Sequence, residues 1–186
     1  MADGNPDSAH VIAATQDWLL KAVIGLNLCP FAKAVHLRQQ IRYAVSDATT
    51  EAALLADLLR ELRLLAAADP AQIETTLLIH PRVLTAFLDY NDFLEVADAA
   101  VAELGLDGEI QVASFHPEYQ FEGSGPGDIE SFSNRAPWPT LHLLRESSIE
   151  KAVAAFPDTA SIYERNVETL RSLGPAGWAK LWSSTA

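Results

Sequence analysis

Apolar positions recur along this chain with two different spacings, and together they predict alternating helices and strands. In three stretches they return every three or four residues, which is the spacing of an amphipathic helix. These stretches cover residues 11–26, 54–65 and 83–104. A cap at Asp158 or Thr159 and a stop at Gly174-Pro175 predict a further helix over about residues 160–173. Short apolar runs, several of them rich in β-branched residues, predict strands instead. They cover residues 41–45, 75–79, 110–115 and 141–145.

The order of these elements predicts the fold class. Ser147 and Glu150 form a capping box for one more helix, ending near Phe156. Strands joined through helices favour parallel neighbours, whereas the last strand follows a loop and is free to run antiparallel. We expect a layered α/β domain with a small, mostly parallel mixed sheet of about four strands, flanked by helices. Residues 1–10 are expected to be a flexible tail and 11–186 a single domain with a long loop at 116–140.

Composition narrows the class of protein further. The 186 residues are 49% hydrophobic, and 13 Lys and Arg against 25 Asp and Glu give a net charge of −12. An acidic surface repels phosphate backbones, so we expect no nucleic-acid partner. No apolar run approaches the roughly 18 residues of a membrane helix, so we expect no membrane partner. The polar N-terminus and the single cysteine favour a cytoplasmic location, without a signal peptide or an intrachain disulfide.

Two histidines directly follow predicted strands, and each precedes a proline: His80 before Pro81 and His116 before Pro117. If these strands run parallel, both imidazoles leave the same edge of the sheet, where open parallel sheets bind ligands. The loop at 116–140 starts at this edge, and its interleaved aromatic residues favour a packed conformation. The alternative is that each histidine only caps its strand through a hydrogen bond.

Cys29 lies at the expected end of the first helix and is a candidate nucleophile. This role requires the imidazole of His116 or His142 within hydrogen-bond reach. A single cysteine is otherwise a small buried apolar residue.

Arg135 and Arg145 lie in and just after the loop, on an otherwise acidic chain. Their planar guanidinium groups suit a carboxylate or phosphate, with Asn134 and Tyr119 as neutral donors. The alternative is that both arginines pair with nearby acidic residues.

Histidine, cysteine and aspartate are also metal ligands, but the chain has no closely spaced ligand pair such as His-x-x-x-His or Cys-x-x-Cys. We therefore assign no metal ligand, and no cofactor is assigned.

Four segments carry a resemblance to a known family. They are Gly25–Ala32, Phe115–Phe121, Asn134–Pro139 and Leu141–Arg145. Through them the chain resembles a bacterial family called domain of unknown function 1415, over about residues 11–182. The resemblance implies no reaction and no catalytic residue.

The leading hypothesis is a small cytoplasmic enzyme, such as a hydrolase or transferase, that acts on an anionic metabolite. In this enzyme His116 is the general acid or base, and His80 lines the substrate site. Cys29 is the nucleophile, and either His116 or His142 is its hydrogen-bond partner. One alternative is a metal-binding protein that uses the histidines. Another is a non-enzymatic binding or regulatory module, which predicts His116 and Arg145 in satisfied internal hydrogen bonds. The substrate, the reaction and a homo-oligomeric state stay open.

Overall fold

The computed structural model describes residues 6–155 and 160–183. Its helices are α1 (Ser8–Trp18), α2 (Ala32–Leu37), α3 (Glu51–Ala67), α4 (Phe87–Glu103), α5 (Glu146–Ala155) and α6 (Ala160–Trp182). A π-helical segment, η1 (Leu19–Ile24), continues α1, and a 3₁₀ helix, η2 (Ile129–Asn134), lies inside the predicted loop. The strands are β1 (Ile41–Val45), β2 (Thr75–Ile79), β3 (Ile110–Phe115) and β4 (Thr140–Arg145).

The strands form one mixed sheet in the order β1-β2-β4-β3, which confirms the predicted α/β class. β1 and β2 are parallel, and β4 is antiparallel to both of its neighbours. Three strands therefore point one way, but only one neighbouring pair is parallel, because β4 lies between β2 and β3. The carboxyl ends of β2 and β3 consequently lie at the same edge, as the sequence predicted.

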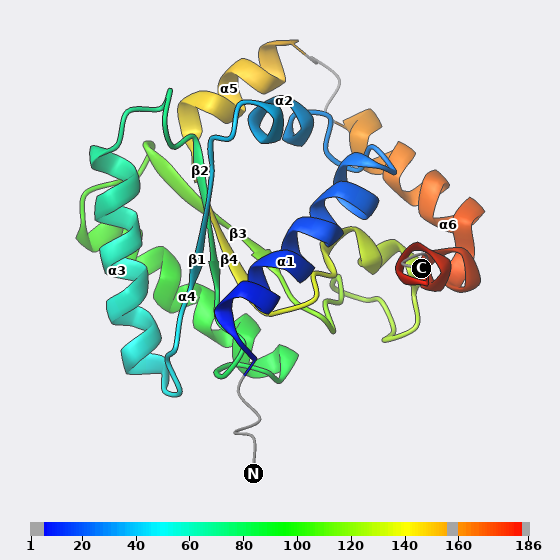
Figure 1. Ribbon diagram of the computed structural model, residues 1–186, viewed down its shortest axis with the longest axis horizontal. Helices are drawn as coiled ribbons and strands as arrows, with labels where there is room; N and C mark the ends of the chain where they lie inside the picture. Colours follow the sequence, from blue (N-terminus) through cyan, green and yellow to red (C-terminus); the bar gives the residue numbers. More distant parts are fainter. Residues whose placement is uncertain (1–5, 156–159, 184–186) are drawn as a thin grey trace.

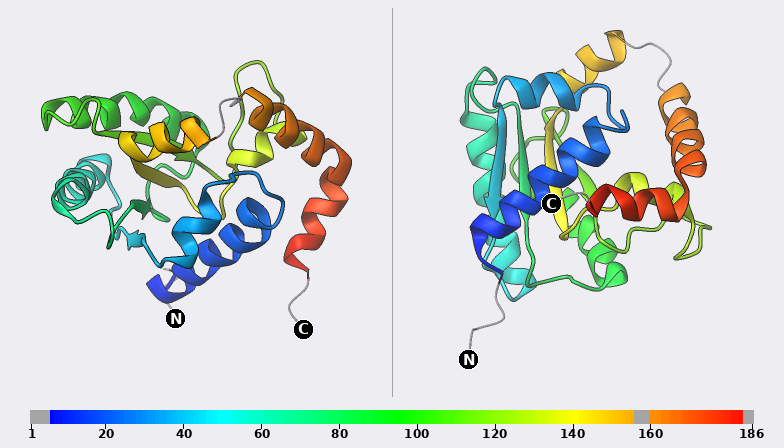
Figure 2. Two further views of the ribbon diagram at one scale, coloured as in Figure 1. Left: turned by 90° about the horizontal axis from the view of Figure 1, so that it is seen from above. Right: turned by 45° about the vertical axis from the view of Figure 1, so that its right-hand side comes forward.

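Helices cover both faces of the sheet. α3 and α4 lie on one face, and α1 lies on the other with α6 further out (Figures 1 and 2). The leucine stripe of α3 is fully buried in the main core, at Leu54, Leu58, Leu62 and Leu65. Among the described residues, no helix is both long and apolar enough to cross a membrane.

The first helix begins earlier than predicted, and it ends at Ile24 with Gly25 as its C-cap, close to the predicted end at residue 26. Residues 1–5 of the expected tail lie outside the described residues, and the helix already begins at Ser8. It continues through η1 with wider turns, and the Gly25 N–H donates to the Leu20 carbonyl five residues earlier at 2.9 Å. A Cβ at Gly25 would collide with the Lys21 carbonyl oxygen, so this wide turn favours glycine.

The third predicted helix starts later than expected, at Phe87 instead of Val83, because residues 81–86 form a turn followed by non-helical backbone. Its end at Gly105 is as predicted. Gly105 has a φ of +67°, and its N–H bonds to the Ala102 carbonyl while the Leu106 N–H bonds to that of Val101. This is the Schellman arrangement, which satisfies the last carbonyls of the helix.

In the C-terminal region, the expected helix end near Phe156 and the expected cap at Asp158 or Thr159 lie outside the described residues. The helix predicted over residues 160–173 does stop at Gly174, which has a non-helical φ of 63°, and a second helical stretch with Pro175 near its start follows after a bend under the same label, α6. Beyond the bend, Trp178 and Leu181 pack against the apolar cluster around Trp18 of α1. The bend therefore lets α6 contact two parts of the protein.

The segment 116–140 is folded down by its aromatic residues, as expected. Tyr119 packs edge-on against Phe87 and Phe121, at centroid distances of 5.3 and 5.2 Å. α6 covers the segment, since Phe121 meets Tyr163 of α6 and η2 contacts the same helix. The predicted loop is thus an ordered layer between the sheet edge and α6 (Figure 2).

Candidate functional site

His80 and His116 are both fully buried at the shared edge of the sheet. The main-chain N–H of His80 donates to the Pro139 carbonyl at 3.0 Å, and that of His116 to the Asn134 carbonyl at 3.1 Å. Both histidines are therefore attached through their backbone to the end of the segment 116–140.

The two imidazoles are neutral, and their partners fix the position of each proton. His116 Nε2 lies 3.2 Å from the Leu84 carbonyl oxygen and so donates, while its Nδ1 accepts from the Glu118 N–H at 3.0 Å. His80 Nδ1 lies 3.0 Å from the Val83 carbonyl oxygen and also donates. Among the described residues, His80 Nε2 has no hydrogen-bond partner.

Burial disfavours the charged form of both histidines. Desolvation lowers the pKa of His80 to about 4, against weaker opposing hydrogen bonding to Val83. Desolvation also lowers the pKa of His116, although the nearby Glu118 carboxylate acts in the opposite direction.

Tyr90 of α4 lies between these two rings. Its hydroxyl donates to the Thr140 carbonyl at 2.8 Å and accepts from the Phe115 N–H at 3.0 Å. Tyr90 therefore joins the end of β3 to the start of β4. Tyr90 lies in the predicted helical stretch 83–104, and the only sequence signal for this role is a hydroxyl at a core position.

Arg145 lies at the opposite edge of the sheet, because the antiparallel β4 ends where β3 begins. Its partner in the register is Ile110, whereas Phe115 pairs with Thr140. Its guanidinium donates to the carbonyls of Leu65 and Ala68 at 2.6 and 2.8 Å, and to that of Ile73. Arg145 thus caps the C-terminal end of α3 and lies away from the two histidines.

Arg135 and Asn134 hold the segment 116–140 together from inside. The Arg135 guanidinium donates to the carbonyls of Tyr119 and Pro126 at 3.2 and 2.6 Å, and it lies 4.0 Å over the Phe132 ring. Asn134 Nδ2 donates to the Ser114 carbonyl at 3.2 Å. Arg135 and Arg145 therefore do not form the alternative ion pairs with nearby acidic residues, because both guanidinium groups donate to main-chain carbonyls.

Cys29 and His142 lie on the other face of the sheet. Thr75 Oγ1 donates to the Leu143 carbonyl, so it accepts from His142 Nε2, 2.7 Å away. Desolvation lowers the pKa of the half-buried His142 to about 4. Cys29 is half-buried against the Trp18 cluster, and its thiol forms no disulfide. The structure therefore separates the thiol from His116.

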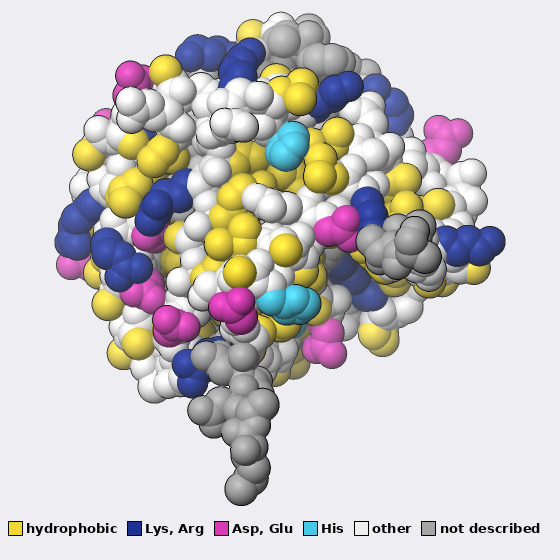
Figure 3. All heavy atoms as spheres, in the orientation of Figure 1, with side chains coloured by type: hydrophobic (Ala, Val, Ile, Leu, Met, Phe, Trp, Pro, Cys, Tyr) yellow, Lys and Arg dark blue, Asp and Glu magenta, His cyan; other side chains and the backbone are white. Residues whose placement is uncertain are grey.

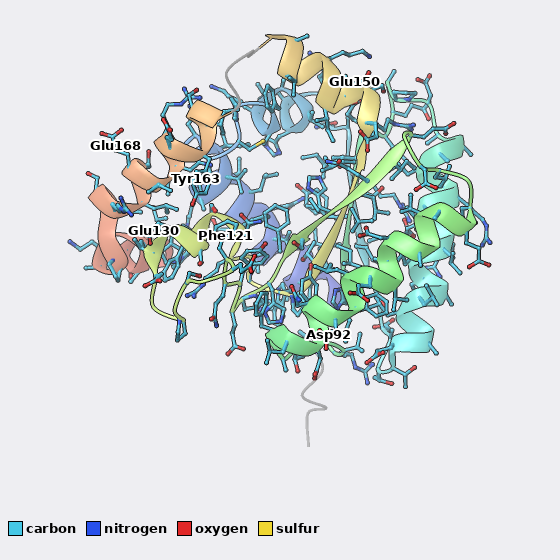
Figure 4. The ribbon with its side chains drawn as sticks, turned by 180° about the vertical axis from the view of Figure 1, so that it is seen from behind. Asp92, Phe121, Glu130, Glu150, Tyr163 and Glu168 are labelled. Atoms are coloured by element: carbon cyan, nitrogen blue, oxygen red, sulfur yellow. The ribbon has the colours of Figure 1, made fainter. Side chains whose placement is uncertain are left out.

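Acidic residues are concentrated in one part of the chain. Residues 83–134 contain no Lys or Arg, and they hold eleven of the acidic residues, close to the net charge of −12. These eleven are Asp89, Asp92, Glu95, Asp98, Glu103, Asp107, Glu109, Glu118, Glu122, Asp128 and Glu130. We call the surface of residues 83–134, which carries these eleven side chains, the acidic side. Figure 4 shows Asp92 and Glu130 from this direction, while Lys and Arg side chains lie over α3 in the opposite view of Figure 3.

A shallow hollow of about 690 Å³ lies at one end of the acidic side, along α6. Tyr163, Glu164, Glu168 and Arg171 line it together with Glu130 of η2. Glu130 and Arg171 form an ion pair at 2.6 Å.

No group of three His, Cys, Asp or Glu side chains that could hold a metal ion occurs within residues 6–155 and 160–183.

The fold and this edge define a mixed α/β domain in which the polar side chains of the sheet edge hold the main chain of an ordered surface segment. The chain belongs to the family described as a protein of unknown function (DUF1415), whose match covers residues 10–180. Comparisons with curated proteins and with solved structures found no significant match.

Proposed function

We propose that this protein is a non-enzymatic binding module that recognises a basic segment of a partner protein through its acidic side. The proposal rests on the hydrogen bonds of His116, Arg135 and Arg145. The side chain of each bonds to main-chain atoms of the protein itself. A catalytic acid, base or anion-binding residue needs an atom free to meet the substrate, whereas these side chains shape a surface.

The charge of this surface supports a basic partner. Five carboxylates line the exposed face of α4, at Asp89, Asp92, Glu95, Asp98 and Glu103. Among the described residues, none of them pairs with a Lys or Arg. Oppositely charged surfaces attract each other at long range, which speeds association and selects the partner.

Apolar side chains on the same face suit a mixed basic and apolar segment. Leu88 and Val96 of α4 are 73% and 39% exposed, and they are adjacent in sequence to Asp89 and Glu95. α4 has 17 residues, which gives it a length of about 25 Å. An extended segment of about eight residues covers this length. The proposed ligand is therefore a short segment in which Lys or Arg alternate with apolar residues.

Fluorescence anisotropy tests the proposal with a labelled ten-residue peptide of alternating Lys, Arg and Leu, and with a matched peptide of Glu and Leu. We expect only the basic peptide to bind. D92N/E95Q should weaken binding roughly fivefold, since an exposed ion pair contributes about 0.2–1 kcal/mol. E51Q/E150Q removes two exposed charges outside the acidic side and should change binding less than about twofold. Equal weakening by both double variants would mean that net charge alone attracts the peptide, and the proposal would be wrong.

The second candidate is an enzyme that acts on a small anionic metabolite in the cytoplasm. The observation that favours it is the placement of Cys29 and His142 on one face of the sheet. Both are half-buried, and Phe115, which packs in the apolar cluster of Cys29, lies 5.9 Å from the His142 ring. A thermal-shift panel of phosphate and carboxylate metabolites tests this candidate. A rise in Tm that C29S or H142N abolishes supports it, and no rise with any metabolite removes it.

A further inference from the structure

His80 and His116 hold one strained turn from two sides. Their ring nitrogens donate to the carbonyls of the neighbouring residues Val83 and Leu84. Leu84 has a φ of 56°, in the left-handed region that residues with a Cβ seldom adopt. Such a conformation persists only where the surrounding structure holds it. The two imidazoles supply part of that restraint.

The same two histidines hold the segment 116–140 near both of its ends. His116 Nδ1 accepts from the Glu118 N–H near the start, and its main-chain N–H donates to the Asn134 carbonyl. The His80 N–H donates to the Pro139 carbonyl at the end of the segment. The two imidazole rings therefore hold the turn, while the segment is held by the His116 ring at Glu118 and by the main-chain N–H groups of both histidines.

We propose that His80 and His116 form an acid-sensitive latch, which holds the segment 116–140 while both rings are neutral and releases it when they are protonated. A proton on His116 Nδ1 converts an acceptor into a donor that faces the Glu118 N–H, so this hydrogen bond is lost. A proton on His80 Nε2 places a positive charge in a buried site where that nitrogen has no described acceptor. The two charges would also repel each other.

The groups that face the latch do not compensate for this charge. Tyr90 and Phe87 of α4 contact His116, and the Glu118 carboxylate and Tyr119 lie beside it on the segment. His80 is stacked on Tyr90. Glu118 is the only carboxylate among these groups. Burial outweighs it, because the pKa of His116 is lowered despite Glu118.

The charged side chain of the turn, that of Arg82, is not part of the latch. Arg82 is exposed, and its guanidinium is directed toward the Asp47 carbonyl at 3.4 Å. The latch does not depend on the proposed binding function. If both hold, acid would rearrange the part of the acidic side that lies in the segment.

Hydrogen exchange measured by mass spectrometry at pH 7.5 and pH 5.0 tests the latch, with rates corrected for the intrinsic effect of pH. The pKa of His80 is about 4 while the segment is held, and it returns to 6.5 on release. At pH 5 this difference raises the ratio of released to held protein about thirtyfold. In wild-type protein we expect amides of residues 118–134 to exchange at least about tenfold faster at pH 5.0. Amides of β2 and β4 should stay protected, because they report global unfolding.

Two variants separate the latch from general acid destabilisation. H80N/H116N keeps short amide side chains but removes both titrating groups, and it should lose the pH response in residues 118–134. H142N removes the half-buried His142, which contacts Thr75 on the opposite face, and it should respond like wild type. Wild-type exchange that is unchanged by pH, or that rises equally throughout the sheet, overturns the proposal even if H80N/H116N does not fold. A pH response that persists in folded H80N/H116N overturns it as well.

Discussion

His80 and His116 contact the same tyrosine ring, with centroids 5.8 and 5.0 Å from that of Tyr90. The two histidines follow β2 and β3, which are not neighbours because β4 lies between them. The Tyr90 hydroxyl bonds to main-chain atoms at the end of β3 and the start of β4. The Tyr90 side chain therefore contacts residues at the ends of β2 and β3 and at the start of β4. The polar groups at this edge of the sheet are consequently used in hydrogen bonds within the fold.

Replacing Tyr90 with Phe should destabilise the protein. The change removes the hydroxyl and leaves the Phe115 N–H and the Thr140 carbonyl without their partner. A buried polar group left unsatisfied costs about 1–3 kcal/mol, so we expect a loss of this size in the free energy of unfolding, measured with urea. Tyr163 is 57% exposed, and Y163F should cost less than about 0.5 kcal/mol. Equal losses in both variants would contradict the role of Tyr90.

Replacing Arg145 with Met should also lower stability. The guanidinium satisfies the carbonyls of Leu65, Ala68 and Ile73 at the end of α3. Hydrogen bonds to a charged group contribute about 1.5–3 kcal/mol, and we expect a loss in this range from urea unfolding. The exposed Arg63 of α3 provides the control, and R63M should be nearly neutral. Unchanged stability in R145M, together with lost affinity for a metabolite, would instead make Arg145 a ligand-binding residue.

Stability should fall in mild acid because His80 is held neutral. The pKa of His80 is about 4 in the folded protein, below its ordinary value of 6.5. The unfolded chain therefore binds the proton more readily, and the stabilisation present above pH 6.5 is lost as the pH falls toward 4. For His80 alone this amounts to roughly 2 kcal/mol between pH 7 and pH 5. Urea unfolding of H80N should show a correspondingly smaller pH dependence, and an identical dependence in both proteins would refute the assignment.

Salt should weaken the binding of the Lys- and Arg-containing peptide. Exposed charges are screened over about 10 Å at 0.1 M salt and about 3 Å at 1 M. We expect the Kd from anisotropy to rise at least about fivefold between 50 and 500 mM NaCl, because the α4 carboxylates are exposed. A Kd that does not respond to salt would show that apolar contacts, such as those of Leu88 and Val96, account for binding instead.

Much of the fold could be predicted because the core of this protein follows simple periodicities. Leu54, Leu58, Leu62 and Leu65 of α3 recur every three or four residues and are fully buried, and each predicted strand has its counterpart in the sheet. The position of His80 and His116 at the same edge could also be predicted from the sequence, because it requires only that β2 and β3 point the same way.

The arrangement of the candidate site could not be predicted, because it depends on strand order and on side-chain direction. The sequence does not show that β4 lies between β2 and β3, which carries Arg145 to the far edge. Nor does it show which face each strand side chain takes, which separates Cys29 and His142 from His116. The turn at Leu84, with its positive φ, has no glycine to indicate it.

The most direct test of the central claim is a hydrogen-exchange footprint of the Lys- and Arg-containing peptide on the wild-type protein at neutral pH and low salt. With the peptide at saturation, we predict slower exchange in residues 87–103 and 118–130, which carry most of the acidic side. Residues 51–67 of α3 should be unchanged, since that helix carries Arg60 and Arg63. Protection confined to α3 or to the face of Cys29 and His142, or no protection anywhere, would contradict the account.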